Sequence, residues 1–212
     1  RDSSTSRGLG DVYKRQHNIL LLKKRIYKMK VLAFLTDGFE TVEALAVIDV
    51  LRRAKIKVIT VSITGDKLVE SAQNIKVQAD SLISEIKCEK DDVMFLPGGP
   101  GHKAYADCEA LTDMLITHNN EGGRIAAICA APSVIGRLGM LKGKKATCFP
   151  GFEEMLKGAE LACADVRVVT DGNITTSRGM GTSIDLGLEL VRLLEGRDEA
   201  DRLAHSTQYV NA

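Results

Sequence analysis

The sequence predicts an α/β fold in which a mostly parallel sheet is covered by helices on both faces. Two observations support this prediction. From Met29 onward, apolar runs of strand length alternate with segments whose apolar residues recur at a helical spacing. The chain also has 212 residues, of which 44% are hydrophobic, which is enough for one domain with a sizeable core. Strands that alternate with helices are typical of a parallel sheet that is buried on both sides.

The first elements follow this alternation closely. Residues 30–35 form an apolar run, and residues 41–54 carry apolar side chains along one helical face. Residues 57–63 are rich in β-branched residues, as strands usually are. Residues 64–90 have a weaker pattern that fits a short hairpin. The next strand, at residues 92–99, ends in Pro-Gly-Gly.

The second half of the chain repeats the pattern. We expect a helix at residues 108–123, which glycines close, and a strand at residues 124–129. A helix at residues 131–141 has Pro132 in its first turn, where the missing N–H does no harm.

Further strands and one helix complete the prediction. Residues 144–149 supply one strand, and residues 165–177 supply a strand pair that folds back at the Asp-Gly-Asn sequence 171–173. The final predicted helix, residues 181–196, has Gly196 past its end.

Three loops follow strands of this predicted sheet, at residues 36–40, 97–101 and 129–132. Ligands of open parallel sheets bind in the crevice beyond the carboxyl ends of the strands. We therefore expect these three loops to form the functional site.

Composition and charge exclude several classes of function. The chain has no run of 18 apolar residues, so it contains no candidate transmembrane helix. The formal net charge is +1, with +6 on residues 1–28 and −5 on the remainder from Met29. The body of the protein therefore offers no basic patch for nucleic acid, and we expect neither a nucleic acid nor a membrane as a partner.

Residues 1–28 differ from the rest of the chain. They begin without Met, show no sustained apolar period, and contain too short an apolar stretch for a signal peptide. We interpret them as a disordered leader encoded by vector, adapter or upstream read-through, followed by a single domain at residues 29–212. A native basic tail is the alternative interpretation.

The pattern of cysteines indicates a reduced compartment. The number of cysteines is odd, and no two of them form a CxxC motif, so we expect a cytoplasmic protein. The four histidines are scattered without the spacing of a zinc site, so we expect no metal. The five cysteines are Cys88, Cys108, Cys129, Cys148 and Cys163.

One of these cysteines ends a predicted strand and opens a predicted helix. Cys129 has Ala127 two residues before it and Ala131 two residues after it, and a tight strand-to-helix turn needs such small neighbours. The helix N-terminus would lower the pKa of the thiol, and the N–H groups of Ala130 and Gly99 would form an oxyanion hole. The alternative is that Cys129 is simply a small buried hydrophobic residue.

Four motifs then resemble a known family. The segments DGFETVEALAVIDVLRRA, LPGGPG, AAICAAPS and TSRGMGTS occur in the order and spacing of the ThiJ/PfpI superfamily, in its DJ-one branch of Parkinson disease protein, deglycase and glyoxalase III-like members. The resemblance covers the chain from Met29 to about Leu203. It implies a flavodoxin-like three-layer α/β/α sandwich, like that of class I glutamine amidotransferases, a homodimer, a catalytic Cys129, and no cofactor.

The resemblance also implies roles for other residues. It places Glu43, not Glu40, beside the thiol as a protonated carboxylic acid, whereas an ordinary acidic residue in a first helical turn is the alternative. Gly98 and Gly99 match a glycine pair that lines the site, and a plain turn explains them equally well. Arg178 matches an arginine that either binds a substrate anion or forms a structural ion pair.

The sequence departs from the family pattern at one position. Deglycase and glyoxalase members have a histidine where this chain has Phe149, which can neither accept nor donate a proton. Cys148 could be a resolving thiol or a packed side chain, and His102 could be a substitute base or a surface-loop residue. Ala130 follows the cysteine where protease-like relatives have histidine, which argues against a peptidase.

Two functions are consistent with these residues. The first is an enzyme in which Cys129 attacks methylglyoxal, glyoxal or the early adducts they form on protein or nucleotide, releasing a hydroxy acid such as lactate. The second is a redox-sensing or stress-protective, chaperone-like protein whose Cys129 oxidises to sulfinate, with little catalysis.

Overall fold

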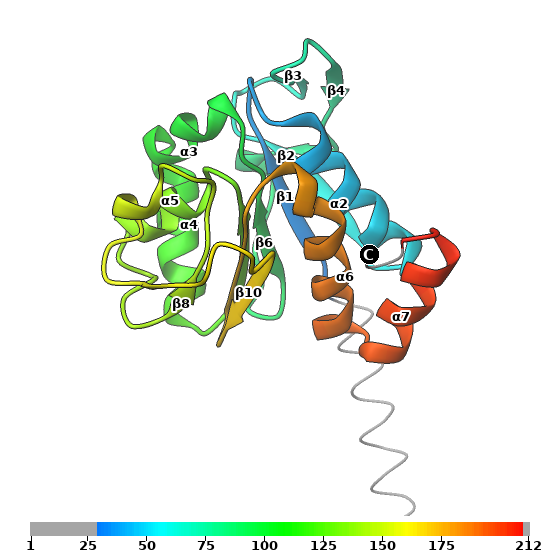
Figure 1. Ribbon diagram of the computed structural model, residues 1–212. Helices are drawn as coiled ribbons and strands as arrows, with labels where there is room; N and C mark the ends of the chain where they lie inside the picture. Colours follow the sequence, from blue (N-terminus) through cyan, green and yellow to red (C-terminus); the bar gives the residue numbers. More distant parts are fainter. Residues whose placement is uncertain (1–28, 210–212) are drawn as a thin grey trace, which may run out of the picture.

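The computed structural model describes residues 29–209, which form a seven-stranded sheet between two layers of helices (Figure 1). The expectation about residues 1–28 falls outside this described part. The strand order is β10-β11-β7-β6-β1-β2-β5, and every pairing is parallel except that of β10 with β11. The strands are β1 (Val31–Leu35), β2 (Val58–Ser62), β5 (Ser81–Leu82), β6 (Val93–Leu96), β7 (Arg124–Ile128), β10 (Val168–Asp171) and β11 (Ile174–Ser177).

The five central parallel strands have the flavodoxin-like order, which confirms the predicted fold class. Counted along the chain, β2, β1, β6, β7 and β11 lie in the order 2-1-3-4-5. In this order the connections leave β1 in opposite directions, so a crevice opens at the carboxyl ends of β1 and β6.

The helices form one layer on each face of the sheet (Figure 1). Helices α2 (Thr41–Arg53), α6 (Ser183–Leu194) and α7 (Arg197–Ser206) cover one face. Helices α3 (Lys103–Asp107), α4 (Glu109–Asn120) and α5 (Pro132–Arg137) cover the other.

Strand β1 shows why the sheet needs both layers. All five of its residues are fully buried, and the first four side chains alternate between two opposite cores. Leu32 and Phe34 join the core under α4 and α5, whereas Val31 and Ala33 join the core under α2 and α6. A strand buried on both faces explains the continuous apolar run in its sequence.

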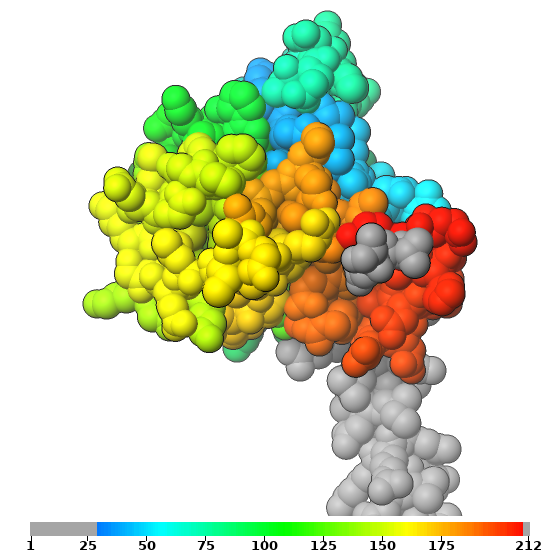
Figure 2. Space-filling model, in the orientation of Figure 1, coloured from blue at the N-terminus to red at the C-terminus, as the bar shows by residue number. Residues whose placement is uncertain are grey.

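Two small strand pairs lie outside the main sheet. The hairpin of β3 (Leu68–Glu70) and β4 (Lys76–Gln78) confirms the predicted excursion. The parallel pair of β8 (Lys145–Ala146) and β9 (Glu160–Leu161) lies beside the edge strand β10. Figure 2 shows the yellow segment that contains β9 on the front of the molecule, next to the orange α6.

The remaining regular elements are four 3-10 helices at the ends of loops. They are η1 (Ile83–Glu85), η2 (Pro100–His102), η3 (Glu153–Met155) and η4 (Met180–Thr182). No helix within residues 29–209 combines the length and the apolar character needed to cross a bilayer.

The structure shortens two of the predicted elements and adds a helix at the end of the chain. The predicted strand at 144–149 is only the two-residue β8, and the helix predicted at 131–141 ends at Arg137, because Gly139 has a φ of 77° that no helix continues. The helix predicted to be last is followed by α7. This helix buries only Ala200 and Leu203, which is too weak an apolar pattern to indicate a helix.

Candidate active site

The three loops predicted to form the site meet at the carboxyl ends of β1, β6 and β7. The backbone N–H of Glu40 donates to the carbonyl of Gly98 over 3.0 Å. The N–H of Gly101 donates in turn to the carbonyl of Gly38 over 2.9 Å. These bonds fix the loop after β1 to the loop after β6, beside the turn that follows β7.

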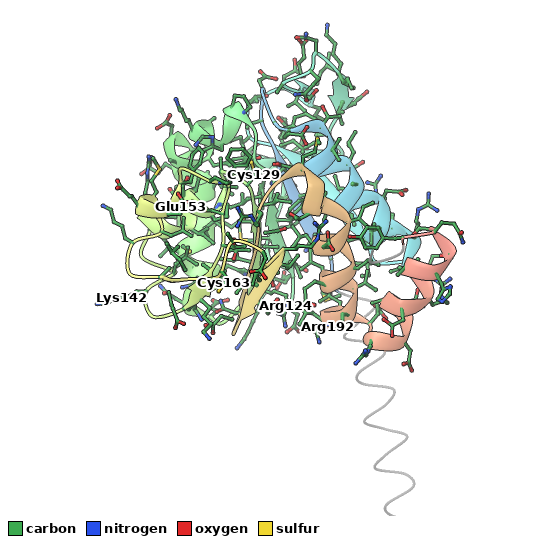
Figure 3. All side chains as sticks on the ribbon, in the orientation of Figure 1. Arg124, Cys129, Lys142, Glu153, Cys163 and Arg192 are labelled. Atoms are coloured by element: carbon green, nitrogen blue, oxygen red, sulfur yellow. The ribbon has the colours of Figure 1, made fainter. Side chains whose placement is uncertain are left out.

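Cys129 occupies a strained turn directly after β7. Its φ is 65°, in the left-handed region that L-residues rarely adopt, which costs roughly 1–3 kcal/mol. Two bonds hold this conformation: the N–H of Cys129 donates to Ser177 O over 2.9 Å, and Phe149 N–H donates to Cys129 O over 2.8 Å. The geometry is that of a nucleophile elbow, which presents the side chain at the end of the sheet. Figure 3 shows Cys129 high in the molecule, with Arg124 at the opposite end of the same strand.

Two backbone donors surround the sulfur. The N–H groups of Ala130 and Gly99 both donate hydrogen bonds to the partly exposed Sγ of Cys129. Gly99 has a φ of 95°, and a β-carbon there would lie 2.4 Å from the backbone nitrogen of Glu40. Only glycine can therefore bring this N–H to the thiol. The two groups predicted to form an oxyanion hole do converge on one atom.

Glu43 is the carboxyl group that contacts the thiol. Its side chain is only 1% exposed and is hydrogen-bonded to Cys129. The N–H of Gly98 donates to its Oε2 over 2.9 Å, and the N–H of Met180 also donates to it. Glu40 has a different task, because its carboxylate caps helix α2 by accepting the N–H of Glu43 over 2.7 Å.

Gly98 leaves the space in which thiol and carboxyl meet. A β-carbon on this residue would lie 2.6 Å from Oε2 of Glu43 and 2.7 Å from Cβ of Cys129. Any larger side chain would have to push the two groups apart. Gly98 thus serves the site through its missing side chain and its N–H.

Burial raises the pKa values of both groups in this contact. For Glu43, burial raises the pKa to about 7, although its hydrogen bonds act in the opposite direction. For Cys129, burial, followed by the charge and the hydrogen bond of Glu43, raises the pKa to about 12, although the Ala130 and Gly99 N–H groups act in the opposite direction. The predicted lowering of the thiol pKa is therefore wrong in direction. Helix α5 has only six residues, so its dipole offsets little of the rise in pKa that burial causes.

The two groups titrate as one unit because they touch. The first proton leaves the pair near pH 7 and the second near pH 12, so a single proton is held between them over this range. In the resting form the thiol donates to the Glu43 carboxylate. If the proton moves onto Glu43, the carboxyl group loses its charge and no longer repels the thiolate. The thiolate then gains a hydrogen bond from the carboxylic acid.

Arg178 comes directly before Gly179 and Met180, and its charge acts on Cys148. The charge of Arg178 favours the thiolate of Cys148, but burial, the larger influence, raises the pKa of that thiol to about 11. Cys148 is buried in the core under α5, as the packed-side-chain alternative predicted. Within residues 29–209, no acidic side chain lies within ion-pair distance of Arg178, so the structural ion pair is not found there.

His102 is not the surface-loop residue that the sequence suggested. It is only 8% exposed, and its Nδ1 lies 2.9 Å from Gly99 O, to which it donates. Its ring meets that of Phe152 edge-on at 5.3 Å. Burial lowers the pKa of His102, which favours the neutral ring, and its hydrogen bond to Gly99 O braces the glycine loop.

The turn before α6 contributes groups that the sequence analysis missed. Thr182 Oγ1 accepts the N–H of Gly179 over 3.1 Å and lies 2.7 Å from Ser177 Oγ. This bracing directs the Met180 N–H to Glu43. The signal was present in TSRGMGTS, whose Ser and Thr side chains are typical of such turns. No group of three or more His, Cys, Asp or Glu side chains in the described part of the chain is arranged to hold a metal ion.

Replacing Glu43 by Gln should stabilise the protein at pH 8 but not at pH 5. A carboxyl whose pKa is raised on folding contributes stability below about pH 4.5 and loses it as pH rises through about 7. The difference corresponds to roughly 3 kcal/mol, or a melting-temperature gain of roughly 5–10 °C at pH 8. Calorimetry at both pH values measures it, and Glu40→Gln is the matched control. A Glu43→Gln shift that is equal at both pH values contradicts this account.

Comparison with known proteins agrees with this fold. Residues 29–193 match the DJ-1/PfpI family. The chain is 39% identical to Protein DJ-1 homolog A of Arabidopsis thaliana over 82% of its length, but spans only 45% of that relative. It is 35% identical to Protein dj-1beta of Drosophila melanogaster over 82% of its length and 93% of that protein.

Two further comparisons concern structure and activity. The solved structure of oxidized Toxoplasma gondii DJ-1 superposes with a TM-score of 0.80 at 34% identity, covering 86% of this chain and 99% of that one. A Caenorhabditis elegans protein named glutathione-independent glyoxalase DJR-1.2 is 29% identical over 79% of this chain and 89% of its own length. This chain therefore belongs to the DJ-1/PfpI family.

Proposed function

We propose that this protein is a cysteine-dependent enzyme that acts on reactive carbonyls and converts methylglyoxal to lactate without a cofactor. The substrate is either the free aldehyde or the early adduct that it forms on a protein or nucleotide. The observation that supports the proposal best is the contact between Cys129 and Glu43, because it joins a nucleophile to a carboxyl group whose pKa is about 7. The glyoxalase name of the Caenorhabditis elegans relative is consistent with it.

The first step is addition of the thiol to the aldehyde carbon. As the S–C bond forms, the thiol proton passes to the Glu43 carboxylate, and the aldehyde oxygen takes up negative charge. The N–H groups of Ala130 and Gly99, which now bind the sulfur, would stabilise this oxygen. The oxygen is then protonated, which gives a hemithioacetal.

The second step moves one proton between neighbouring carbons. Glu43 removes the hydrogen of the former aldehyde carbon as a proton, and a proton is returned to the ketone carbon. In the same rearrangement the hydroxyl proton on the first carbon moves to the oxygen of the ketone. The first carbon is thereby oxidised to a thioester and the second is reduced to an alcohol, so no external oxidant is needed. Water then cleaves the S–C bond, lactate leaves and the thiol is restored. A general base with a pKa near the working pH suits both transfers.

The remaining features of the site fit this assignment. Phe149 cannot take part in proton transfer, and His102 donates to Gly99 O, so Glu43 is the acid–base group that the proposal relies on. Arg178 is available to attract the carboxylate of the product. We also propose a homodimeric, cytoplasmic protein, because its relatives are similar over most of the chain and all five cysteines are free.

Lactate formation from methylglyoxal tests the enzyme directly. We expect turnover by the unaltered protein, loss to background in Cys129→Ser, and a loss of roughly 100-fold or more in Glu43→Gln, because each removes a group that bonds to or exchanges protons with the substrate. Cys163→Ser is the matched control, since Cys163 is exposed and lies well apart from Cys129 (Figure 3). Lactate at the same rate in Cys129→Ser and the unaltered protein would rule the enzyme out.

A second candidate function is redox sensing. The hydrogen-bond donors that surround Sγ of Cys129 could equally bind the oxygens of a sulfinate, and a protonated Glu43 would add one more. The oxidised form of the Toxoplasma gondii relative is in accord with this candidate. Each equivalent of peroxide would transfer one oxygen to the sulfur and be reduced to water.

Titration with hydrogen peroxide separates this candidate from general oxidation. We expect a mass increase of two oxygens on Cys129 before any change at Cys163, because the Ala130 and Gly99 N–H groups would stabilise the oxidised sulfur of Cys129. Intact mass and peptide mapping provide the measurement. If the exposed Cys163 oxidises first, Cys129 is not the sensor.

A further inference from the structure

Two large apolar side chains stand exposed beside the reacting pair. Phe149 is 47% exposed and Met180 is 55% exposed. They come from different parts of the chain, the loop after β8 and the 3-10 helix before α6. Exposed apolar side chains that gather around a polar reacting centre call for an explanation, because they leave water in contact with apolar surface.

The backbone fixes Phe149 to the reacting pair. Its N–H donates to Cys129 O over 2.8 Å, so it cannot move away without disturbing the strained turn. Its ring lies against Gly179, where a β-carbon would be 3.2 Å from Cδ2 of Phe149 and 3.8 Å from Oε1 of Glu43. The ring and the carboxyl group therefore border the same glycine.

Met180 directly follows Gly179 in the chain and also contacts the pair. Its N–H donates to Glu43, and its side chain points outward to solvent. Gly179 between the two adds no side chain of its own. Together Phe149 and Met180 form what we call the apolar wall, which adjoins the carboxyl group that touches the thiol.

We propose that the apolar wall binds the substituent of the carbonyl substrate, so that the site prefers glyoxals with an extended alkyl chain to methylglyoxal. This inference rests on the proposed function. The reacting aldehyde carbon must lie at Sγ, and its neighbouring carbon must lie within reach of Glu43. A substituent on that second carbon then extends past the carboxyl group to the wall, where each methylene loses contact with water.

Rates with two substrates test the preference. We expect kcat/KM for butylglyoxal to exceed that for methylglyoxal, each followed as its 2-hydroxy acid product. Phe149→Ala should reduce the ratio of the two kcat/KM values by roughly tenfold, because three further methylenes lose an apolar contact. Met180→Ala should reduce it in the same direction by a smaller factor.

Ile116→Ala is the matched control. Ile116 is also a large exposed apolar residue, at 39%, but it lies in the second half of α4. This half lies at the amino ends of the strands, since His118 bonds to Asp92 O just before β6. The substitution should leave the ratio unchanged.

The outcomes distinguish this inference from the proposed function. Turnover of both substrates with a ratio that Phe149→Ala does not change overturns the apolar-wall inference alone. If that variant instead changes the oligomeric state in light scattering with an unchanged ratio, the wall is a contact between copies, and the inference is again wrong. No turnover of either substrate by the unaltered protein overturns the proposed function and this inference with it.

Discussion

The contact between the Cys129 thiol and the Glu43 carboxyl is the interaction on which the rest of the site depends. Two buried acidic groups in contact cannot both be charged, so they keep one proton between them from about pH 7 to about pH 12. The position of that proton decides the chemistry. On sulfur it leaves a carboxylate base, and on oxygen it leaves a nucleophilic thiolate beside a carboxylic acid.

The fold supplies this contact from three separate parts of the chain. The turn after β7 holds the thiol, α2 holds the carboxyl group, and the glycines after β6 leave the space between them. Hydrophobic cores hold the helices on both sides of the contact in place. Helix α2 packs on one face of the sheet, and α5, which follows the Cys129 turn, packs on the other. Because close-packed cores resist displacement, the strained conformation at Cys129 persists.

Sequence reasoning could predict the arrangement but not the electrostatics. The alternation of apolar periods indicated the doubly covered sheet, and small residues around Cys129 indicated the turn. The pKa of the thiol depends on burial and on Glu43, which lies 86 positions earlier in the chain. No local sequence pattern around Cys129 can therefore predict this pKa. The burial of His102 likewise follows from tertiary packing. The early end of α5 follows from the left-handed Gly139, and α7 has too few buried residues to show a period.

The pH dependence of Cys129 alkylation tests the shared proton most directly. With iodoacetamide and peptide mapping between pH 5 and 10, the account predicts a rate that rises to a midpoint near pH 7 and then levels off. In Glu43→Gln the rise should move above pH 8. A rate in the unaltered protein that climbs tenfold per pH unit through pH 9, or one that is flat from pH 5, would contradict the account.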